Sequence, residues 1–408
     1  MNPSGDPAAA DPTTVSRRRL RIGVVTNGLA ITGGVERCVL EDTRDLVAAG
    51  HHVAVWHRDS PAGRADDGRG PFDSLRVPLV RADDYRFGIR TALRDALRFA
   101  RQGLRLRRAR LDVLWLNRPE FLPFGRVASI VSGVPLAVHL HHAPNYRRLA
   151  PIAGGRTRYF AVSQAMAEAW TAVGVPADRI TLVSNGVDTH AFPPPTASDT
   201  QAARGDLGID DGTPVVLYYG RLTRAKGVVA VLEAWRTVLT TAAARQPVTV
   251  PAAGPVTRSA PLLVLAGALP TEDADEVRRA VAALPADSVL VVPERDDVVP
   301  LLHAADMVVA PSLEPEGFGR VVVEAMSAGR PVVAAASGGT GEILSDEWAR
   351  FTVDPTDAEA LAACVLSTLD EAAIGPELGA RCRAWVRDRY DRAQHVDALL
   401  GALDDVAR

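Results

Sequence analysis

The chain of 408 residues is longer than one hydrophobic core usually supports, so its length predicts two domains. It is 47% hydrophobic and 23% charged with a net charge of -3, which is typical of a soluble α/β protein and argues against general binding to nucleic acid or anionic membranes. Three scattered cysteines exclude a disulfide framework and favour a reducing, cytoplasmic location.

The first 19 residues are rich in Pro, Ala and Asp and lack the apolar centre of a signal peptide, so we expect a disordered tail there. No uninterrupted apolar run reaches the roughly 18 residues of a transmembrane helix.

Short apolar runs then alternate with longer helical patterns. The first series of predicted strands is 20–25, 52–57, 113–117, 136–140, 159–162 and 180–183. The second series is 215–219, 262–266, 289–292, 307–310 and 332–335.

Strands of this kind, buried on both faces and separated by helices, form parallel sheets, so we expect two doubly wound α/β domains. The Pro-rich stretch 192–208 is predicted to separate them because it fits neither a helix nor a central strand. The expected domains are 20–195 and 205–380. We expect a long last helix over about 376–408, whose final part, 381–408, crosses back to the first domain. A second low-complexity stretch, 245–261, is interpreted as a surface loop.

The segment "GRLTRAKG" (220–227) contains Lys226, the only lysine among 46 Lys and Arg residues. A predicted strand precedes it and a predicted helix follows, so Arg221 and Lys226 lie at the carboxyl edge of a sheet, where α/β proteins bind ligands. A guanidinium fork and a compact ammonium suit the two phosphates of a diphosphate, and Gly220 and Gly227 permit close approach to the backbone. Two solvated charges are the alternative, but one lysine in an arginine-rich chain favours the phosphate site.

The stretch "EPEGFGRVVVEAMSAGRPVV" (314–333) places Glu316 in a loop and Glu324 about one turn into a helix that begins near Gly319. The free amides of a first helical turn bind anions, so this helix start is predicted to hold a phosphate. Glu324 would accept hydrogen bonds from a ribose diol, and Glu316 would reach the other side of the ligand. Solvated glutamates and turn-forming glycines explain each residue separately but not their joint arrangement.

These residues resemble glycosyltransferase family 4, whose members have the GT-B fold of two facing Rossmann-like domains. The two glutamates separated by seven residues are the family's most specific mark. They are accompanied, in family order, by "GGVER" (33–37), "FAVSQAM" (160–166), "VSNGVD" (183–188), "GRLTRAKG" and "SGGTGEIL" (337–344). The resemblance extends from about residue 20 to the final helix.

The resemblance implies a retaining enzyme that moves a hexose or N-acetylhexosamine from a nucleotide diphosphate sugar to an acceptor hydroxyl. A UDP-sugar is the favoured donor, the acceptor is a glycan, a lipid-linked sugar or a natural product, and no metal ion or other cofactor is needed. Arg221 and Lys226 would hold the diphosphate and support its departure, Glu316 would lie near the donor sugar, and Glu324 would bind the ribose. The other implied donor-binding residues are Gly33, Gly34, Asn185, Gly220, Gly317, Phe318 and Gly319, with Gly186 lining the same interdomain space.

Three histidines in "HLHHAP" (139–144) close a predicted strand. The family has a histidine here that contacts the donor sugar near the anomeric carbon, and the resemblance favours His141, with His142 and His139 as alternatives. Side chains alternate along a strand, so only His139 and His141 share a face, and we predict no metal site. The Asp-x-Asp at 273–275 is interpreted as helix capping.

Two stretches depart from the family pattern on the side of the nucleotide base, "AGALPTED" (266–273) and "VVPERDDV" (291–298), so the base stays open. The acceptor loops, 58–90 and 143–157, carry little pattern, and the acceptor and the oligomeric state stay open too. A nucleotide-sugar epimerase or phosphorylase on the same fold is the alternative function. The sequence lacks the glycine fingerprint of a nicotinamide-dependent dehydrogenase. A non-catalytic sensor would not need both the carboxylates and the cations.

The segment 90–110 holds eight arginines against one acid. Leu93, Leu97, Ala100 and Leu104 form an apolar stripe along it. Such a helix would bind an anionic membrane surface or a phosphorylated acceptor. The favoured interpretation is an ordinary helix packed on its sheet, with arginine as the usual surface residue of this chain.

Overall fold

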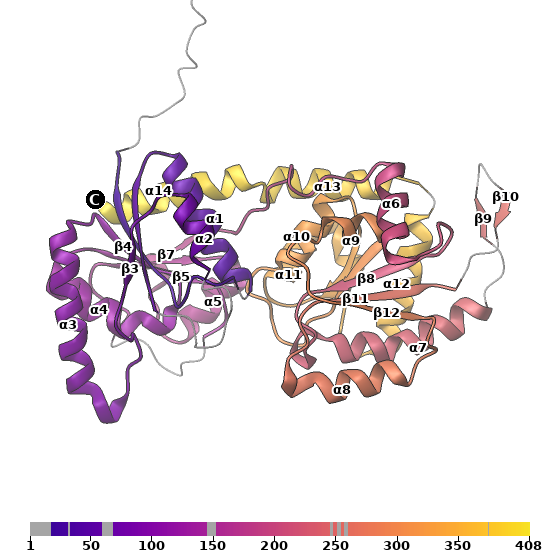
Figure 1. Ribbon diagram of the computed structural model, residues 1–408, viewed down its shortest axis with the longest axis horizontal. Helices are drawn as coiled ribbons and strands as arrows, with labels where there is room; N and C mark the ends of the chain where they lie inside the picture. Colours follow the sequence, from indigo (N-terminus) through magenta and orange to yellow (C-terminus); the bar gives the residue numbers. More distant parts are fainter. Residues whose placement is uncertain are drawn as a thin grey trace, which may run out of the picture.

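The computed structural model describes residues 18–31, 33–58, 68–144, 152–244, 248–250, 254–256, 260–373 and 375–408. They form two domains along the long axis of the molecule, each built on a parallel sheet with helices around it (Figure 1). The two α/β domains expected from the strand pattern are therefore present. Within the described residues, no helix combines the length and the apolar character needed to cross a membrane.

The first domain contains a seven-stranded parallel sheet in the order β3-β2-β1-β4-β5-β6-β7. Its strands are β1 (Arg21–Val25), β2 (His52–His57), β3 (Leu79–Arg81), β4 (Val113–Leu116), β5 (Leu136–Leu140), β6 (Thr157–Ala161) and β7 (Ile180–Leu182). The central strands β4 and β5 are buried at every position, which is why they read as continuous apolar runs. The helices are α1 (Gly34–Ala48), α2 (Arg69–Ser74), η1 (Ile89–Thr91), α3 (Ala92–Ala109), η2 (Pro119–Phe121), α4 (Leu122–Ser132), α5 (Gln164–Ala172) and η3 (Ala177–Arg179).

The second domain contains a six-stranded parallel sheet in the order β12-β11-β8-β13-β14-β15. Its strands are β8 (Val215–Tyr219), β11 (Leu262–Ala266), β12 (Val289–Val292), β13 (Met307–Ala310), β14 (Val332–Ala335) and β15 (Thr352–Val353). The helices are α6 (Ala197–Leu207), η4 (Arg224–Lys226), α7 (Val228–Ala244), α8 (Thr271–Ala282), α9 (Val299–Ala304), α10 (Arg320–Ser327), α11 (Gly338–Ile343), η5 (Asp346–Phe351) and α12 (Ala358–Ala372). An antiparallel pair, β9 (Val248–Val250) and β10 (Gly254–Val256), lies in the stretch interpreted as a surface loop.

The prediction that 192–208 contains no helix is wrong, because α6 occupies most of this stretch. Thr196 accepts a hydrogen bond from the amide of Asp199 at 3.2 Å, and the Asp199 carboxylate accepts one from the amide of Thr196 at 2.9 Å. This capping box starts the helix directly after three prolines. Prolines in that position precede the helix and interrupt none of its hydrogen bonds.

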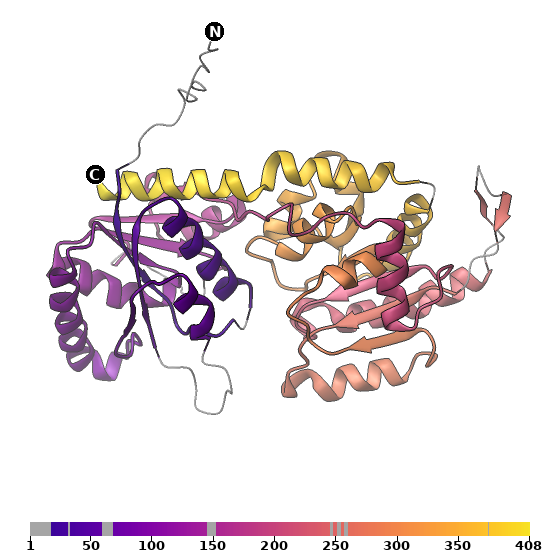
Figure 2. The same cartoon turned by 45° about the horizontal axis from the view of Figure 1, so that its top comes forward.

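The long last helix is divided into α13 (Glu377–Tyr390) and α14 (Arg392–Ala407) by the extended residue Asp391. The Asp391 side chain accepts a hydrogen bond from the amide of Ala393 at 3.0 Å and so caps α14. Helix α13 packs on α10 of the second domain, whereas α14 packs on α1 and on β4, β5 and β6 of the first. Figure 2 shows both helices, in yellow, running along one side of the two domains. The chain therefore returns to its first domain after completing the second.

Helix α3 lies on the outer flank of the first domain, at the left of Figure 1. It packs on α4 through a buried face that contains Phe99, Gly103 and Leu106. Leu93 and Leu97, from the apolar stripe recognised in the sequence, are exposed to solvent. The interpretation of an ordinary packed helix therefore accounts for one face of α3 and is wrong for the other.

Candidate functional site

The lone lysine and the first glutamate of the motif are in direct contact. Lys226 Nζ lies 2.5 Å from Glu316 Oε1, and the two side chains are 31% and 27% exposed. Lys226 is carried by η4, which follows β8, and Glu316 by the loop after β13, the parallel neighbour of β8. The carboxyl edge of the second sheet thus brings together two residues that the sequence assigned to one ligand.

The loop that carries Lys226 is held by backbone contacts. Thr223 caps η4 by accepting a hydrogen bond from the amide of Lys226 at 3.3 Å. The carbonyl of Ala225 accepts a hydrogen bond from the amide of Leu313 at 2.9 Å. Gly227 has a φ of +81°, and a Cβ there would lie 2.0 Å from the carbonyl oxygen of Pro311. Only glycine permits this approach, which places η4 against the loop that leads to Glu316.

Arg221 lies on the predicted loop after β8, but the environment of its side chain differs from that of Lys226. It follows Gly220, whose φ of +127° turns the chain at the end of β8. Its backbone carbonyl accepts a hydrogen bond from the Tyr218 hydroxyl at 3.1 Å, and its side chain is exposed. Across the described ranges no carboxylate pairs with this guanidinium. The side chain is therefore available to an anionic ligand, and its role in holding the diphosphate stays a prediction.

Glu324 is buried in the first turns of α10 and is held at both oxygens. The Tyr219 hydroxyl donates to Oε2 at 3.1 Å, and Arg320 Nε donates to Oε1 at 3.1 Å. Burial, and then the Glu324 carboxylate, raise the pKa of Tyr219 well above its usual value, so the phenol stays a donor. Each carboxylate oxygen can accept a further hydrogen bond from a ligand hydroxyl.

Arg320 is a site residue that the sequence analysis missed. Its guanidinium donates to both oxygens of Glu41 on α1, at 2.8 and 3.1 Å, in addition to Glu324. It thus connects the carboxylate of the donor motif to the first domain. The four-residue spacing between Arg320 and Glu324 is a helical ion-pair pattern visible in the sequence, but nothing in the sequence pointed to Glu41.

The glycines of the donor loop lie against the first domain. A Cβ at Gly317 would be 2.0 Å from the carbonyl oxygen of His141, and the Gly317 carbonyl accepts a hydrogen bond from the Ser163 hydroxyl at 2.7 Å. Gly319 has a φ of +108° and precedes α10, and Phe318 packs edge-on against Tyr390 with ring centroids 5.7 Å apart. The start of α10 therefore faces the interdomain space, where a ligand can reach its free amides.

The three histidines occupy three different environments. His139 and His141 share a face of β5 and its continuation, as predicted, and their rings stack at 4.0 Å. Burial lowers the pKa of His139 to about 3 and lowers that of His141 well below its usual value, so both rings are neutral at pH 7. His142 lies 3.0 Å from Glu120, and this hydrogen bond raises its pKa. His141 stays the favoured contact to the donor sugar because its backbone touches Gly317.

The remaining predicted donor-binding residues lie at two places along the first domain. Gly33 and Gly34 start α1, and a Cβ at Gly34 would be 3.4 Å from Arg320 Cδ, so this turn faces the start of α10. Asn185 is buried next to Gly186, and a Cβ at Gly186 would be 2.9 Å from Arg392 Cα. The structure thus explains Gly186 by close packing on α14, and the donor-binding role of Asn185 stays a prediction.

Two of the sequence motifs meet across the domain interface. Glu342, from "SGGTGEIL", accepts hydrogen bonds from the amides of Gln164 at 2.9 Å and Ala165 at 2.6 Å, which belong to "FAVSQAM". These amides open α5, so a carboxylate of the second domain caps a helix of the first. Among all the residues that the structure describes, no three His, Cys, Asp or Glu side chains converge as metal ligands.

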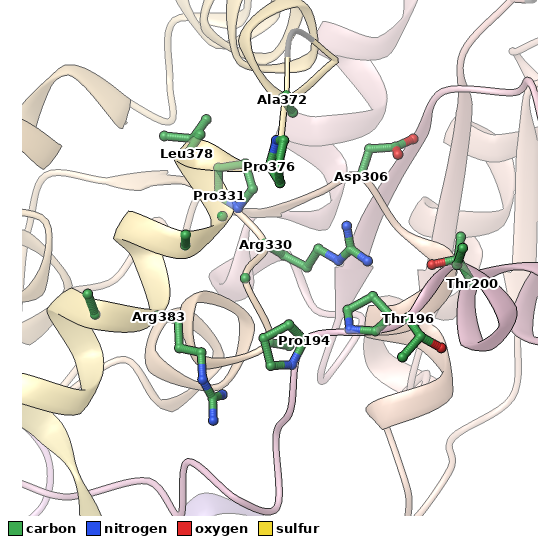
Figure 3. Close-up of a pocket in the computed structure, with 18 of the residues that line it drawn as sticks. Pro194, Thr196, Thr200, Asp306, Arg330, Pro331, Ala372, Pro376, Leu378 and Arg383 are labelled. Carbon is green, nitrogen blue, oxygen red and sulfur yellow. The ribbon is translucent and has the colours of Figure 1, made fainter.

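A separate pocket of about 540 Å³ lies outside this site (Figure 3). The interdomain linker, with Pro194 and Thr196, forms one wall, and α13, with Leu378 and Arg383, forms another. None of the predicted donor-binding residues lines it. Arg383 donates its hydrogen bonds to backbone carbonyls, including that of Ser327 at 2.7 Å, so its charge is used in joining these segments. We interpret the pocket as the junction between linker and α13.

Comparison with known families assigns both halves of the chain. Residues 32–191 match the family described as Glycosyltransferase Family 4, and residues 199–385 match the family described as Glycosyl transferases group 1. Together these ranges contain every predicted catalytic and donor-binding residue.

Two curated relatives show how far the sequence likeness extends. The D-inositol 3-phosphate glycosyltransferase of Xylanimonas cellulosilytica is 34% identical over 234 residues, which is 56% of this chain and 51% of that protein. The alpha-maltose-1-phosphate synthase of Mycobacterium tuberculosis is 34% identical over 171 residues, 40% of this chain and 39% of that protein. The chain thus spans about half the length, or less, of these curated relatives.

The crystal structure of Anabaena HepE in complex with UDP and glucose resembles this fold with a TM-score of 0.75 and 22% sequence identity. The likeness covers 95% of this chain and 100% of that one. The expected architecture of two facing Rossmann-like domains, the GT-B fold, is therefore confirmed.

Proposed function

Because the chain belongs to glycosyltransferase family 4, we propose that it transfers a sugar from a nucleotide diphosphate donor to an acceptor hydroxyl. The observation that carries the proposal is the contact of Lys226 with Glu316 at the carboxyl edge of the second sheet. The sugar is a hexose or an N-acetylhexosamine, and the acceptor is a glycan, a lipid-linked sugar or a small natural product. UDP is the favoured nucleotide, and the UDP complex of the structural neighbour HepE supports that choice.

In the proposed reaction, negative charge develops on the departing diphosphate. Lys226, the exposed Arg221 and the first amides of α10 would face that charge, and such fixed donors are usually the largest electrostatic contribution to catalysis. Glu316 positions the Lys226 ammonium through the 2.5 Å contact and would accept a hydrogen bond from a hydroxyl of the donor sugar. Glu324, oriented by Tyr219 and Arg320, would bind the ribose diol.

We propose that the anomeric configuration is retained. The bond between the anomeric carbon and the diphosphate oxygen breaks, the acceptor oxygen bonds to the same face of that carbon, and the departing phosphate takes the acceptor proton. His141, kept neutral by burial, would lie near the anomeric carbon without adding charge. The contacts between Gly317 and the first domain support a closed site that excludes water and limits hydrolysis of the donor.

The proposed reaction uses no metal ion, since Lys226 and Arg221 supply positive charge where the diphosphate would leave. We expect the rate of donor turnover to be unchanged after treatment with EDTA. A loss of activity that Mg²⁺ or Mn²⁺ restores would contradict this part of the proposal.

A nucleotide titration tests the proposed function. We would follow thermal unfolding of the wild type with UDP, GDP and TDP, because a ligand that binds the native state raises the melting temperature by mass action. The same titration would be made on Lys226→Ala and on Arg224→Ala. Arg224 lies on the same η4 but is exposed and pairs with Glu276, so it is a matched control.

We expect one nucleotide to stabilise the wild type and Arg224→Ala, and to stabilise Lys226→Ala much less. Release of that nucleotide from its sugar conjugate, only when an acceptor is added, would then identify transfer. Stabilisation by none of the three nucleotides would contradict the proposal, as would equal stabilisation of both variants. Conversion of the donor sugar without an acceptor would indicate an epimerase instead.

A further inference from the structure

Helix α3 carries apolar side chains on two opposite faces. Phe99 and Leu106 are buried against the domain. On the outer side, Leu93, Leu97 and Leu104 are 77%, 53% and 51% exposed. Successive residues of an α-helix are about 100° apart, so these three leucines lie on one stripe, opposite the buried face. We call them the α3 stripe.

The stripe continues beyond the start of the helix. Ile89, on the preceding η1, is 90% exposed, and Phe87 just before it is 48% exposed. Five large apolar side chains are thus exposed between positions 87 and 104, whereas single exposed apolar residues need no explanation.

Arginines border the α3 stripe, and the one acidic side chain of α3 lies elsewhere. Asp95 is buried and accepts hydrogen bonds from the Thr91 hydroxyl at 2.6 Å and from the amide of Gly88 at 3.0 Å. Within 90–110, the exposed arginines that have no carboxylate of the described residues within ion-pair distance are Arg90, Arg101, Arg107, Arg108 and, just beyond the end of α3, Arg110.

We propose that α3 binds to the surface of an anionic lipid bilayer. The α3 stripe would enter the boundary between head groups and acyl chains, and the bordering arginines would bind lipid phosphates. A helix that lies in the plane of a membrane combines an apolar face with basic residues along its sides, and the attraction of each arginine to an anionic leaflet adds to the burial of the leucines.

Other binding partners would match only one feature of this surface, either its arginines or its leucines. A nucleic acid would bind the arginines but leave the leucines in water. A second copy of the chain would cover the leucines but would bring two rows of arginine together, and their like charges repel. A bilayer accommodates both features, and the outer position of α3 leaves room for a flat surface (Figure 1).

The full-length protein would be sedimented with vesicles of phosphatidylcholine and with vesicles that also contain about 30% phosphatidylglycerol. We expect binding to the anionic vesicles only, with a decrease as the salt concentration rises. This readout does not use activity, so its result is separate from that of the proposed transfer reaction.

Two variants and two matched controls locate the contact. Leu93→Gln combined with Leu97→Gln should lower the vesicle partition coefficient about tenfold or more, because insertion is lost. Arg101→Gln combined with Arg108→Gln should lower it by a similar factor. The controls are Leu182→Gln on β7, which is 49% exposed, and Arg236→Gln on α7, which is also exposed.

All of these positions face solvent, so circular dichroism and the melting temperature should be unchanged. Failure of the wild type to bind anionic vesicles would overturn the proposal. Unchanged binding of the leucine variant would also overturn it, since it would show attraction of charge without insertion. A wild-type dimer that the leucine variant dissociates, without vesicle binding, would assign the stripe to self-association instead.

Discussion

The ion pair with Glu316 is a physical reason for a lysine at position 226, in a chain whose other Lys or Arg positions are all arginine. An ammonium is a compact charge on a flexible stem, whereas a guanidinium is a planar fork of five donors. With Nζ at 2.5 Å from the carboxylate, this contact suits a compact charge, which in the proposed function would also face a phosphate of the donor. Arg221, exposed on the same loop, has room for the larger group.

Lys226→Arg should therefore lower kcat about 10²-fold even though the charge is kept, because the fork cannot occupy the same point beside Glu316. Steady-state release of nucleotide from the donor would measure this. The control is Arg224→Lys on the same loop, which should leave kcat unchanged. Wild-type kinetics for Lys226→Arg would show that the site requires charge alone.

Substitution of Glu316 should lower kcat as much as substitution of Lys226. Glu316→Gln removes the carboxylate that positions the Lys226 ammonium while keeping the size of the side chain, so kcat should fall by about 10²-fold. Glu314→Gln, an exposed glutamate in the same loop, is the matched control. Similar kinetics for the two variants would remove Glu316 from the site.

The buried His139 should make the stability of the protein depend on pH. Burial lowers its pKa from the usual 6.5 to about 3, so the native state keeps this ring neutral while the unfolded chain protonates it below about pH 6.5. The unfolded state then binds more protons, and the free energy of unfolding falls as the pH falls from about 6.5 towards 3.

Urea unfolding at pH 7 and pH 5 would measure this effect, which His139→Phe should reduce. Phe keeps an aromatic ring between Trp115 and Phe160, which lie 5.7 and 6.1 Å away between ring centroids. Burial raises the pKa of Asp42, but His395 and Arg392 lower it overall, so its contribution to stability is lost only as the pH falls below about 3.8, outside the measured range. Equal loss of stability in both proteins would assign the pH dependence to other groups.

At the scale of single residues, the sequence singled out both glutamates, the lysine and the histidine, and their roles at the site stay predictions. These residues stand in short motifs whose spacing is set by one loop or one helix. Arg320 and Glu342 stand in the same motifs, but their partners, Glu41 and the amides of α5, belong to the other domain. A contact between domains leaves no periodic signal in either segment, and for that reason it was not predicted.

Among the elements, the donor loop before α10 depends on a glycine for its place. A Cβ at Gly317 would lie 2.0 Å from the carbonyl oxygen of His141, which is far inside the contact distance. Gly317→Ala should force the loop and the first domain apart and lower kcat/KM for the donor about 10²-fold, since small displacements at a reacting centre have effects of that size. Gly212→Ala is the control, because a Cβ there meets nothing within 4 Å. Equal kinetics for the two variants would show that the close approach is not needed.

The central strands were predictable because most of their four or five positions are apolar and buried. The edge strands β3 and β15, of three and two residues, carry too little pattern to be recognised, whereas the three-residue edge strand β7 was predicted within the longer run 180–183. The three prolines at 193–195 indicate irregular chain in the sequence, although in the structure they only precede the start of α6. The break at Asp391 was missed because the apolar pattern continues on both sides of it.

At the scale of the whole molecule, ion pairs between α14 and α1 join the last helix of the chain to the first domain. Arg392 lies 2.5 Å from Asp42 and 2.7 Å from Asp45, and His395 lies 2.9 Å from Asp42. Arg392→Met would leave Asp42 buried without its main cationic partner, which should lower the free energy of unfolding by about 3 to 5 kcal/mol. Urea unfolding would measure the loss, with Arg387→Met, an exposed position on α13, as control. A loss no larger than that of the control would show that the cluster adds little.

Helix α14 also contributes Leu399 and Leu403 to the core that contains Ile22 and Trp115. A ribosome produces Ile22 and Trp115 early but produces α14 only after the whole second domain. The first domain therefore exposes this part of its apolar core until α14 has been synthesised, so we expect it to become fully stable only after the second domain is complete. A chain stopped after Asp391 should be cut by protease within the first domain sooner than within the second. We thus expect the domain that is synthesised first to be completed last.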